Sequence, residues 1–252
     1  MAWLHYVRLF KGNHMLNVES FEITLEISRT DGDDVNSFKV PVPSRNSRVL
    51  DALLYVRHNI DPSLGFRYSC RAGMCGSCAV VINGKEGLSC QTTIGSLQSD
   101  VVRVEPMRAL PVLKDVMCDM DPFFKTLIKS HAALVSNDPD RKTLRIMPPG
   151  EKVRKSIQDQ SGCITCGACF SACEWSATKE EYLGPSAMNR ILMLALDERD
   201  LLGKKRLRGI ATDSGIFRCH GLGSCSTVCP VDIPLREGMQ KLKGLISKGD
   251  FD

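Results

Sequence analysis

Alternation of hydrophobic and polar positions is strongest in the first half of the chain, where it predicts β-strands. The segment SFEITLEI places apolar side chains at every second position from Phe21 to Ile27, which is typical of a half-buried strand. Further strands are predicted at Leu4–Phe10, in FKVPVP, on both sides of Asn83-Gly84, and in DVVRVEP. The segment TDGDDVNS predicts a polar loop.

Helical spacing of apolar residues first appears in SRVLDALLYVRHN and then dominates the second half of the chain. Helices are predicted in DPFFKTLIKS, GPSAMNRILMLALDERDLLG and PLREGMQKLKGLISKG. In the second of these, Pro185 suits the first helical position and Gly203 the stop. The pattern predicts an α+β protein, with a strand-rich domain at 1–108 and a helical domain at 109–252.

Composition and charge narrow the class of protein. The 252 residues are 43% hydrophobic and 25% charged, with a formal net charge of +4 and no run rich in Lys and Arg, so we expect no nucleic-acid partner. No apolar run is long enough to span a membrane, and the start MAWLHYVRLF does not resemble a signal peptide. With 12 cysteines in a chain expected in a reducing compartment, metal binding is favoured over disulfides.

The first cysteine motif is CRAGMCGSC followed by a distal fourth cysteine. Its spacing, C-x4-C-x2-C, is that of a plant-type [2Fe-2S] cluster, and a single zinc ion usually takes paired C-x2–4-C ligands instead. Gly73 and Gly76 allow the backbone to wrap closely around a cluster. The predicted [2Fe-2S] ligands are Cys70, Cys75, Cys78 and Cys90.

Two further motifs, CITCGACFSAC and CHGLGSCSTVC, follow the pattern of two-cluster ferredoxins. In those proteins the fourth cysteine of each run ligates the other cluster. That rule predicts one complete [4Fe-4S] set, consisting of Cys163, Cys166, Cys169 and Cys229. The second set has three members, Cys173, Cys219 and Cys225, because Leu222 stands where a fourth ligand is expected. Three thiolates suit a [3Fe-4S] cluster or a [4Fe-4S] cluster with one open iron.

These sets use eleven cysteines and leave Cys118, which lies in VLKDVMCDMDPFF with no partner at ligand spacing. A free cysteine is commonly a small buried apolar residue, and we expect that role for Cys118.

Taken together, the motifs SCRAGMCGSC, INGKEGLSC, LPVLKDV, CITCGAC and CHGLGSCSTVCP resemble the iron–sulfur subunit of succinate dehydrogenases and fumarate reductases over nearly the whole chain. The resemblance implies a β-grasp [2Fe-2S] domain followed by an all-α domain with [4Fe-4S] and [3Fe-4S] clusters. It also implies that the chain passes single electrons between the FAD of a flavoprotein subunit and membrane quinone, with no catalytic residue of its own. A haem b membrane anchor would hold it at the cytoplasmic face of the inner membrane.

The resemblance places His220 and Leu222 in the family's quinone-side segment. Many members have Pro after the cysteine matching Cys173 and, a few residues later, a Trp that contacts quinone; here Glu174 follows, and the Trp positions hold Ala177 and Thr178. Trp175 is nearby but out of register. This stretch is more similar to menaquinone-linked, di-haem members with a single anchor subunit.

Two other functions fit parts of the pattern. A soluble thiol-linked fumarate reductase would use a related subunit, although such subunits usually carry more cysteine-rich sequence after the cluster domain. A zinc-stabilised interaction module would be colourless, whereas an iron–sulfur protein is brown.

Overall fold

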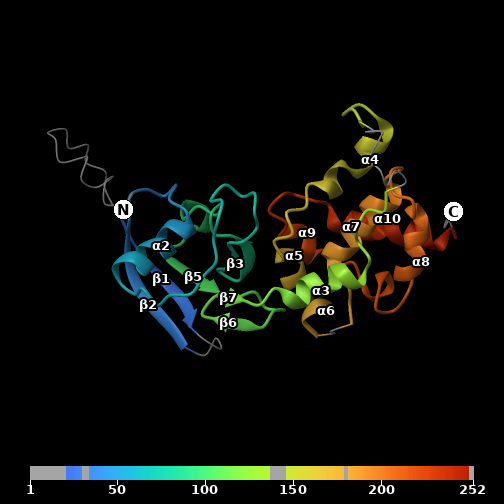
Figure 1. Ribbon diagram of the computed structural model, residues 1–252. Coiled ribbons are helices and arrows are strands. Elements are labelled where there is room, and N and C mark those ends of the chain that lie inside the picture. The colour runs from blue at the N-terminus through green and yellow to red at the C-terminus, as the bar shows by residue number, and fades with distance from the viewer. Residues whose placement is uncertain (1–20, 30–33, 137–145, 179–180, 250–252) are drawn as a thin grey trace.

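The computed structural model describes residues 21–29, 34–136, 146–178 and 181–249, and the strand predicted at Leu4–Phe10 lies outside them. Figure 1 shows the strands gathered at one end of the molecule and most of the helices at the other. This division matches the predicted α+β class. No helix in the described ranges is long and apolar enough to cross a bilayer.

The strand-rich end is a mixed five-stranded sheet in the order β2-β1-β5-β3-β4. Strands β1 and β5 are parallel, and the other neighbours are antiparallel. Helix α2 (Val49–Asn59) buries its apolar residues in the same core as the sheet, which gives a β-grasp arrangement (Figure 1). The strands are β1 (Phe21–Arg29), β2 (Asp34–Val42), β3 (Ala79–Ile82), β4 (Lys85–Leu88) and β5 (Val101–Glu105).

Most strand predictions are confirmed. Ile23, Leu25 and Ile27 are buried, as the alternation in β1 requires. At the β3–β4 turn, Asn83 and Gly84 have φ values of 46° and 82°, the left-handed pair that a type I′ hairpin needs. The prediction of a loop through Ser37 is wrong, because β2 already begins at Asp34. As an edge strand, β2 is held by backbone pairing along the whole of β1, so its first residues need no apolar alternation.

The helical end is built around α7 (Gly184–Leu196), which is buried along most of its length and packs against α4 (Lys152–Ser161) and α10 (Leu235–Ser247). The other helices are α3 (Asp121–Lys129), α5 (Ala168–Ser171), α6 (Glu174–Thr178), α8 (Arg206–Ile210) and α9 (Ser224–Thr227). Short 3-10 turns are η1 (Gly95–Leu97), η2 (Gly203–Lys205) and η3 (Ile216–Arg218). The predictions of α3 and α10 are confirmed, whereas α4 was not predicted.

Helix α7 ends earlier than the sequence suggested. Gly203 is not its stop, because the helix ends at Leu196 and Asp197 is extended. The buried Asp197 carboxylate accepts hydrogen bonds from the backbone and side chain of Arg199. This local bonding competes with further helical hydrogen bonds, and it turns the chain away from the helix axis.

A two-stranded hairpin, β6 (Val112–Lys114) and β7 (Met117–Cys118), lies between the two ends. Its turn residue Asp115 is buried and accepts a hydrogen bond from Arg29 of β1 at 2.8 Å. The apolar core of the sheet extends into the helical end, since Phe170 of α5 belongs to the same cluster as the sheet and meets Phe123 of α3 edge-to-face at 5.6 Å, whereas the buried residues of α7 and α10 form a core of their own. The two ends therefore form one packed body.

Candidate metal centres

The first cysteine loop joins α2 to β3 and turns its backbone N–H groups toward one sulfur. Ala72, Met74 and Cys75 donate backbone hydrogen bonds to Sγ of Cys70 at 3.4, 3.3 and 3.3 Å. Gly73 lies in the left-handed region with φ of 73°, which lets the loop close on itself. Three converging N–H donors stabilise a thiolate, so the loop fits an anionic metal cluster.

The four cysteines of this set lie at the boundary between solvent and the protein core. Cys70 and Cys75 are exposed, whereas Cys78 and Cys90 are buried. Burial raises the pKa of Cys78 to about 11. Hydrogen bonds, first from the Ser77 side chain and then from backbone N–H groups, lower the pKa of Cys75 to about 6. Metal ions would offset the cost of burying the two inner thiolates.

The second set converges on a small pocket at the N-terminal side of α5. All four predicted [4Fe-4S] ligands line it: Cys163, Cys166, Cys169 and Cys229. Burial raises the pKa of Cys166 to about 11 and that of Cys169 further still. The backbone N–H of Ile233 donates to Sγ of Cys229 at 3.4 Å. Burial thus disfavours bare thiolates at Cys166 and Cys169, and metal ions bound there would offset that cost.

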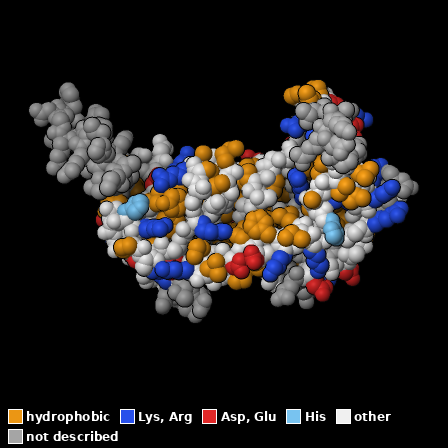
Figure 2. Space-filling view, in the orientation of Figure 1, with side chains coloured by type: hydrophobic (Ala, Val, Ile, Leu, Met, Phe, Trp, Pro, Cys, Tyr) orange, Lys and Arg blue, Asp and Glu red, His pale blue; other side chains and the backbone are white. Residues whose placement is uncertain are grey.

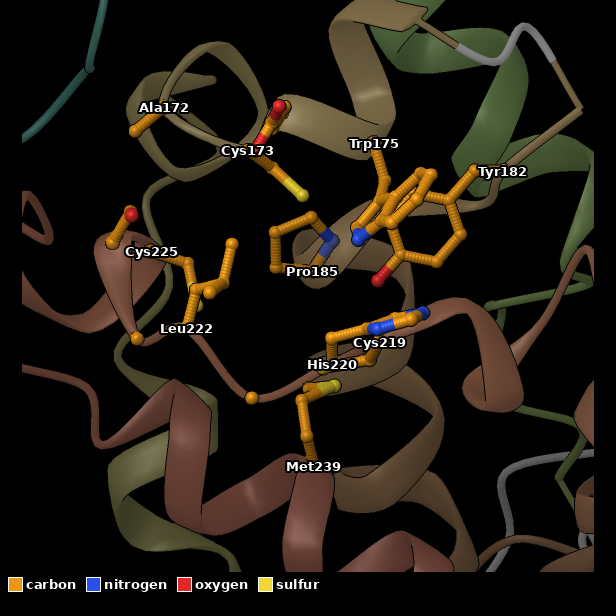
Figure 3. Close-up of a pocket in the computed structure, with 14 residues that line it drawn as sticks. Ala172, Cys173, Trp175, Tyr182, Pro185, Cys219, His220, Leu222, Cys225 and Met239 are labelled. Atoms are coloured by element: carbon orange, nitrogen blue, oxygen red, sulfur yellow. The ribbon is translucent and has the colours of Figure 1, made fainter.

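The third set lines a separate, mostly apolar cavity. The three predicted ligands, Cys173, Cys219 and Cys225, surround it together with Leu222, whose side chain lies near Cys225 and across from Cys173 (Figure 3). Buried Tyr182 also lines this cavity. Leu222 is 68% exposed, so its side chain forms part of the outer wall and is not a core residue.

The structure therefore brings together the same cysteines that the crossed two-cluster rule groups. Cys229 lies with the first run and Cys173 with the second. Within the described residues no group of three or more His, Cys, Asp or Glu side chains is arranged to hold a metal ion directly. The second set offers four cysteines and the third set three, and closed structural zinc sites take four ligands, so the third set does not match a structural zinc site.

The first and second sets are in direct contact through Gly76. A Cβ on Gly76 would lie 2.7 Å from both Cα and Cβ of Cys166, so only glycine permits this approach. A Cβ on Gly167, the residue after Cys166, would lie 2.9 Å from the terminal methyl of Met120. These contacts fix the first cysteine loop against the second set.

Cys118 is buried in the core as predicted, with 2% of its surface exposed. Its thiol donates to the backbone carbonyl of Met107 at 3.7 Å. This satisfied position keeps Cys118 separate from the three sets.

One aromatic residue of the third cavity was noted in the sequence only as lying out of register with the family pattern. Trp175 lies with its ring centroid 4.9 Å from that of His220 (Figure 3). The guanidinium of Arg218 lies 5.6 Å from the centre of the Trp175 ring. Ala177 and Thr178, the positions where the family pattern places Trp, line a different groove beside α3. Counting positions after Cys173 against the family pattern did not select Trp175, although Trp175 is only two residues from Cys173 and lies at the start of α6.

Comparison with known proteins agrees with this geometry. The family model described as a 2Fe-2S iron-sulfur cluster binding domain matches residues 24–125, and that of a 4Fe-4S dicluster domain matches residues 159–233. The fumarate reductase iron-sulfur subunit of Mycobacterium tuberculosis is 34% identical over 228 residues, covering 88% of this chain and 91% of that protein. This chain belongs to the family of succinate dehydrogenase and fumarate reductase iron–sulfur subunits.

Other members of the family have similar lengths and the same fold. The mitochondrial succinate dehydrogenase [ubiquinone] iron-sulfur subunit 1 of Oryza sativa is 32% identical, covering 88% of this chain and 81% of that protein. A chain of the Mycobacterium smegmatis Sdh1 complex in the apo form superimposes with a TM-score of 0.80 at 25% identity, covering 92% of this chain and 98% of that one. Membership of an iron–sulfur family argues against the alternative of a zinc-stabilised interaction module.

Proposed function

We propose that this iron–sulfur subunit carries single electrons between the FAD of a flavoprotein subunit and membrane quinone. The observation that carries the proposal is the crossed grouping of cysteines, with four in one cavity and three in the next. The direction of catalysis, succinate oxidation or fumarate reduction, is then set by the potential of the quinone. A haem b anchor subunit would place the chain on the cytoplasmic face of the inner membrane.

Each cluster has a proposed set of ligands. Cys70, Cys75, Cys78 and Cys90 hold [2Fe-2S]; Cys163, Cys166, Cys169 and Cys229 hold [4Fe-4S]; Cys173, Cys219 and Cys225 hold [3Fe-4S]. When bound, these groups supply one-electron redox chemistry that no side chain of this chain offers. The chain's own residues exclude water from the inner thiols, donate N–H groups to sulfur, and fix the loops against one another. The proposed domains are residues 1–108 and 109–252.

The third cavity is the proposed quinone side of the subunit. Its wall is apolar apart from a few groups, and His220, Leu222 and Trp175 reach it together. The Trp175 ring provides a flat apolar surface, and the His220 imidazole stacked on it provides a hydrogen-bonding edge. We propose that Trp175 supplies the aromatic surface that Ala177 and Thr178 do not. Menaquinone is the favoured quinone because of the sequence around Glu174.

Replacing one ligand tests the crossed grouping. In the full-length chain, purified anaerobically, Cys229→Ala is expected to abolish the reduced [4Fe-4S] EPR signal and leave the oxidised three-iron signal. Cys118→Ala is the matched control and is expected to keep all three signals, because its thiol bonds only to a backbone carbonyl. Loss of the three-iron signal with retention of the four-iron signal in Cys229→Ala would contradict the grouping.

Replacing His220 tests the quinone side. In the assembled complex, His220→Ala is expected to slow quinone-linked turnover roughly tenfold while turnover with an artificial electron acceptor falls less than twofold, because a lost hydrogen bond to a bound ligand costs on the order of 1–2 kcal/mol. His58→Ala, at an exposed position on α2, is the control and should affect neither rate. Equal loss of both rates in His220→Ala would indicate a structural role.

A further inference from the structure

A buried carboxylate lies where the strand-rich and helical ends meet. Glu86 of β4 is 4% exposed, and its Oε1 accepts a hydrogen bond from the hydroxyl of Ser171 in α5 at 2.9 Å. The guanidinium of Arg108 lies 3.4 Å from the same oxygen. Among the other buried carboxylates in the described ranges, Asp115 of the β6–β7 turn bonds to Arg29 of the sheet, and Asp197 and Asp200 bond within the helical end.

The contacts around Glu86 close into a ring that joins three segments. The Ser171 hydroxyl oxygen accepts the backbone N–H of Arg108 at 2.9 Å while its hydrogen goes to Glu86. Arg108 Nη2 donates to the carbonyl of Gly84 in the β3–β4 turn at 2.5 Å. The ring therefore links the hairpin, the connecting chain and α5, and it fixes the carboxylate in one position.

This position adjoins residues of the second set of cysteines. Ser171 lies on α5 between the ligands Cys169 and Cys173. Glu86 and Cys229 line the same groove between the two ends. Gly76 of the first cysteine loop is packed on Cys166 nearby in the junction. A charge at Glu86 therefore acts on groups bound by the second set of cysteines.

We propose that Glu86 is a positioning residue whose negative charge lowers the reduction potential of the cluster held by Cys163, Cys166, Cys169 and Cys229. This inference rests on the proposed function. Reduction adds one electron and no proton, so a fixed negative charge beside the site opposes it. Arg108 does not cancel this effect, because its side chain is 52% exposed and screened by water while that of Glu86 is 2% exposed.

The test is a redox titration of the full-length chain followed by EPR. Glu86→Gln keeps the shape and the hydrogen-bond acceptor but removes the charge. At a fixed ambient potential we expect its reduced-to-oxidised [4Fe-4S] ratio to rise about tenfold, which corresponds to about 59 mV for one electron. Glu86→Asp retains the charge and should restore a ratio within about twofold of wild type. Glu22→Gln removes an exposed charge on β1 and should leave the ratio unchanged.

An unchanged ratio in Glu86→Gln, with the cluster present, overturns the proposal, as does an equal rise in Glu86→Asp. If Glu86→Gln loses its cluster, the Arg108→Gln variant provides the test. Removing the partly compensating cation should lower the reduced-to-oxidised [4Fe-4S] ratio about two- to threefold. An unchanged ratio in Arg108→Gln overturns the proposal. Failure of the proposed function is distinct from these results, because wild-type protein would then show no [4Fe-4S] signal at all.

Discussion

Replacing Leu222 with cysteine is expected to convert the proposed three-iron cluster into a [4Fe-4S] cluster. Leu222 lines the cavity of Cys173, Cys219 and Cys225, and a thiol there completes the C-x2-C-x2-C-x3-C pattern. EPR of the oxidised protein gives the readout, because an oxidised three-iron cluster is paramagnetic and an oxidised [4Fe-4S] cluster is silent. The added thiolate also brings negative charge, so the potential should fall and quinone-linked turnover should slow.

Two variants control for the Leu222→Cys experiment. Leu201→Cys adds a thiol at a similarly exposed leucine outside the cavity and should retain the three-iron signal. Leu222→Ala opens the same wall without a ligand and should also retain it. A three-iron signal that survives in Leu222→Cys would mean that position 222 does not face the vacant corner. Absence of this signal from wild type would refute the three-iron assignment itself.

The largest loss of stability is expected for Arg206→Met. Arg206 and Asp200 form an ion pair whose side chains are 4% and 0% exposed. The guanidinium also donates to the carbonyls of His131 and Ala133 at 2.5 and 2.6 Å. Removing it leaves Asp200 buried without a cation, which costs about 3–5 kcal/mol. Denaturant unfolding of the full-length chain measures this free energy.

An exposed ion pair provides the matched control for Arg206→Met. Lys39 lies 3.6 Å from Glu22 with both side chains more than half exposed, so Lys39→Met should change the unfolding free energy by less than about 1 kcal/mol. The prediction for Arg206 is wrong if the two variants lose similar stability. The double variant Arg206→Met with Asp200→Leu should recover part of the loss, because no buried charge remains uncompensated.

Local sequence determined the elements whose signals lie within a few residues. The alternation in β1, the Asn83-Gly84 turn, and the spacing in α2, α3 and α10 are each set by side-chain period or by turn geometry. The cysteine motifs are equally local, because a loop that wraps a cluster needs ligands and glycines at fixed intervals. Family membership followed from these same motifs.

Long-range contacts determined the element boundaries and side-chain positions that local sequence did not predict. The start of β2 and the end of α7 depend on pairing with β1 and on the bonds around Asp197, which no periodicity reveals. Trp175 reaches the His220 cavity because α6 directs it there, although register counting favoured positions two and three residues later.

The sequence by itself predicted which cysteines can bind metal and how they divide into sets, because the ligand residues and their spacing can be read directly along the chain. Only the tertiary structure decided how the sets meet. Gly76 touches Cys166 across 90 positions of sequence, and Glu86 meets Ser171 across 85. Such contacts depend on how the strand-rich and helical ends pack against each other, and packing is a property of the whole fold.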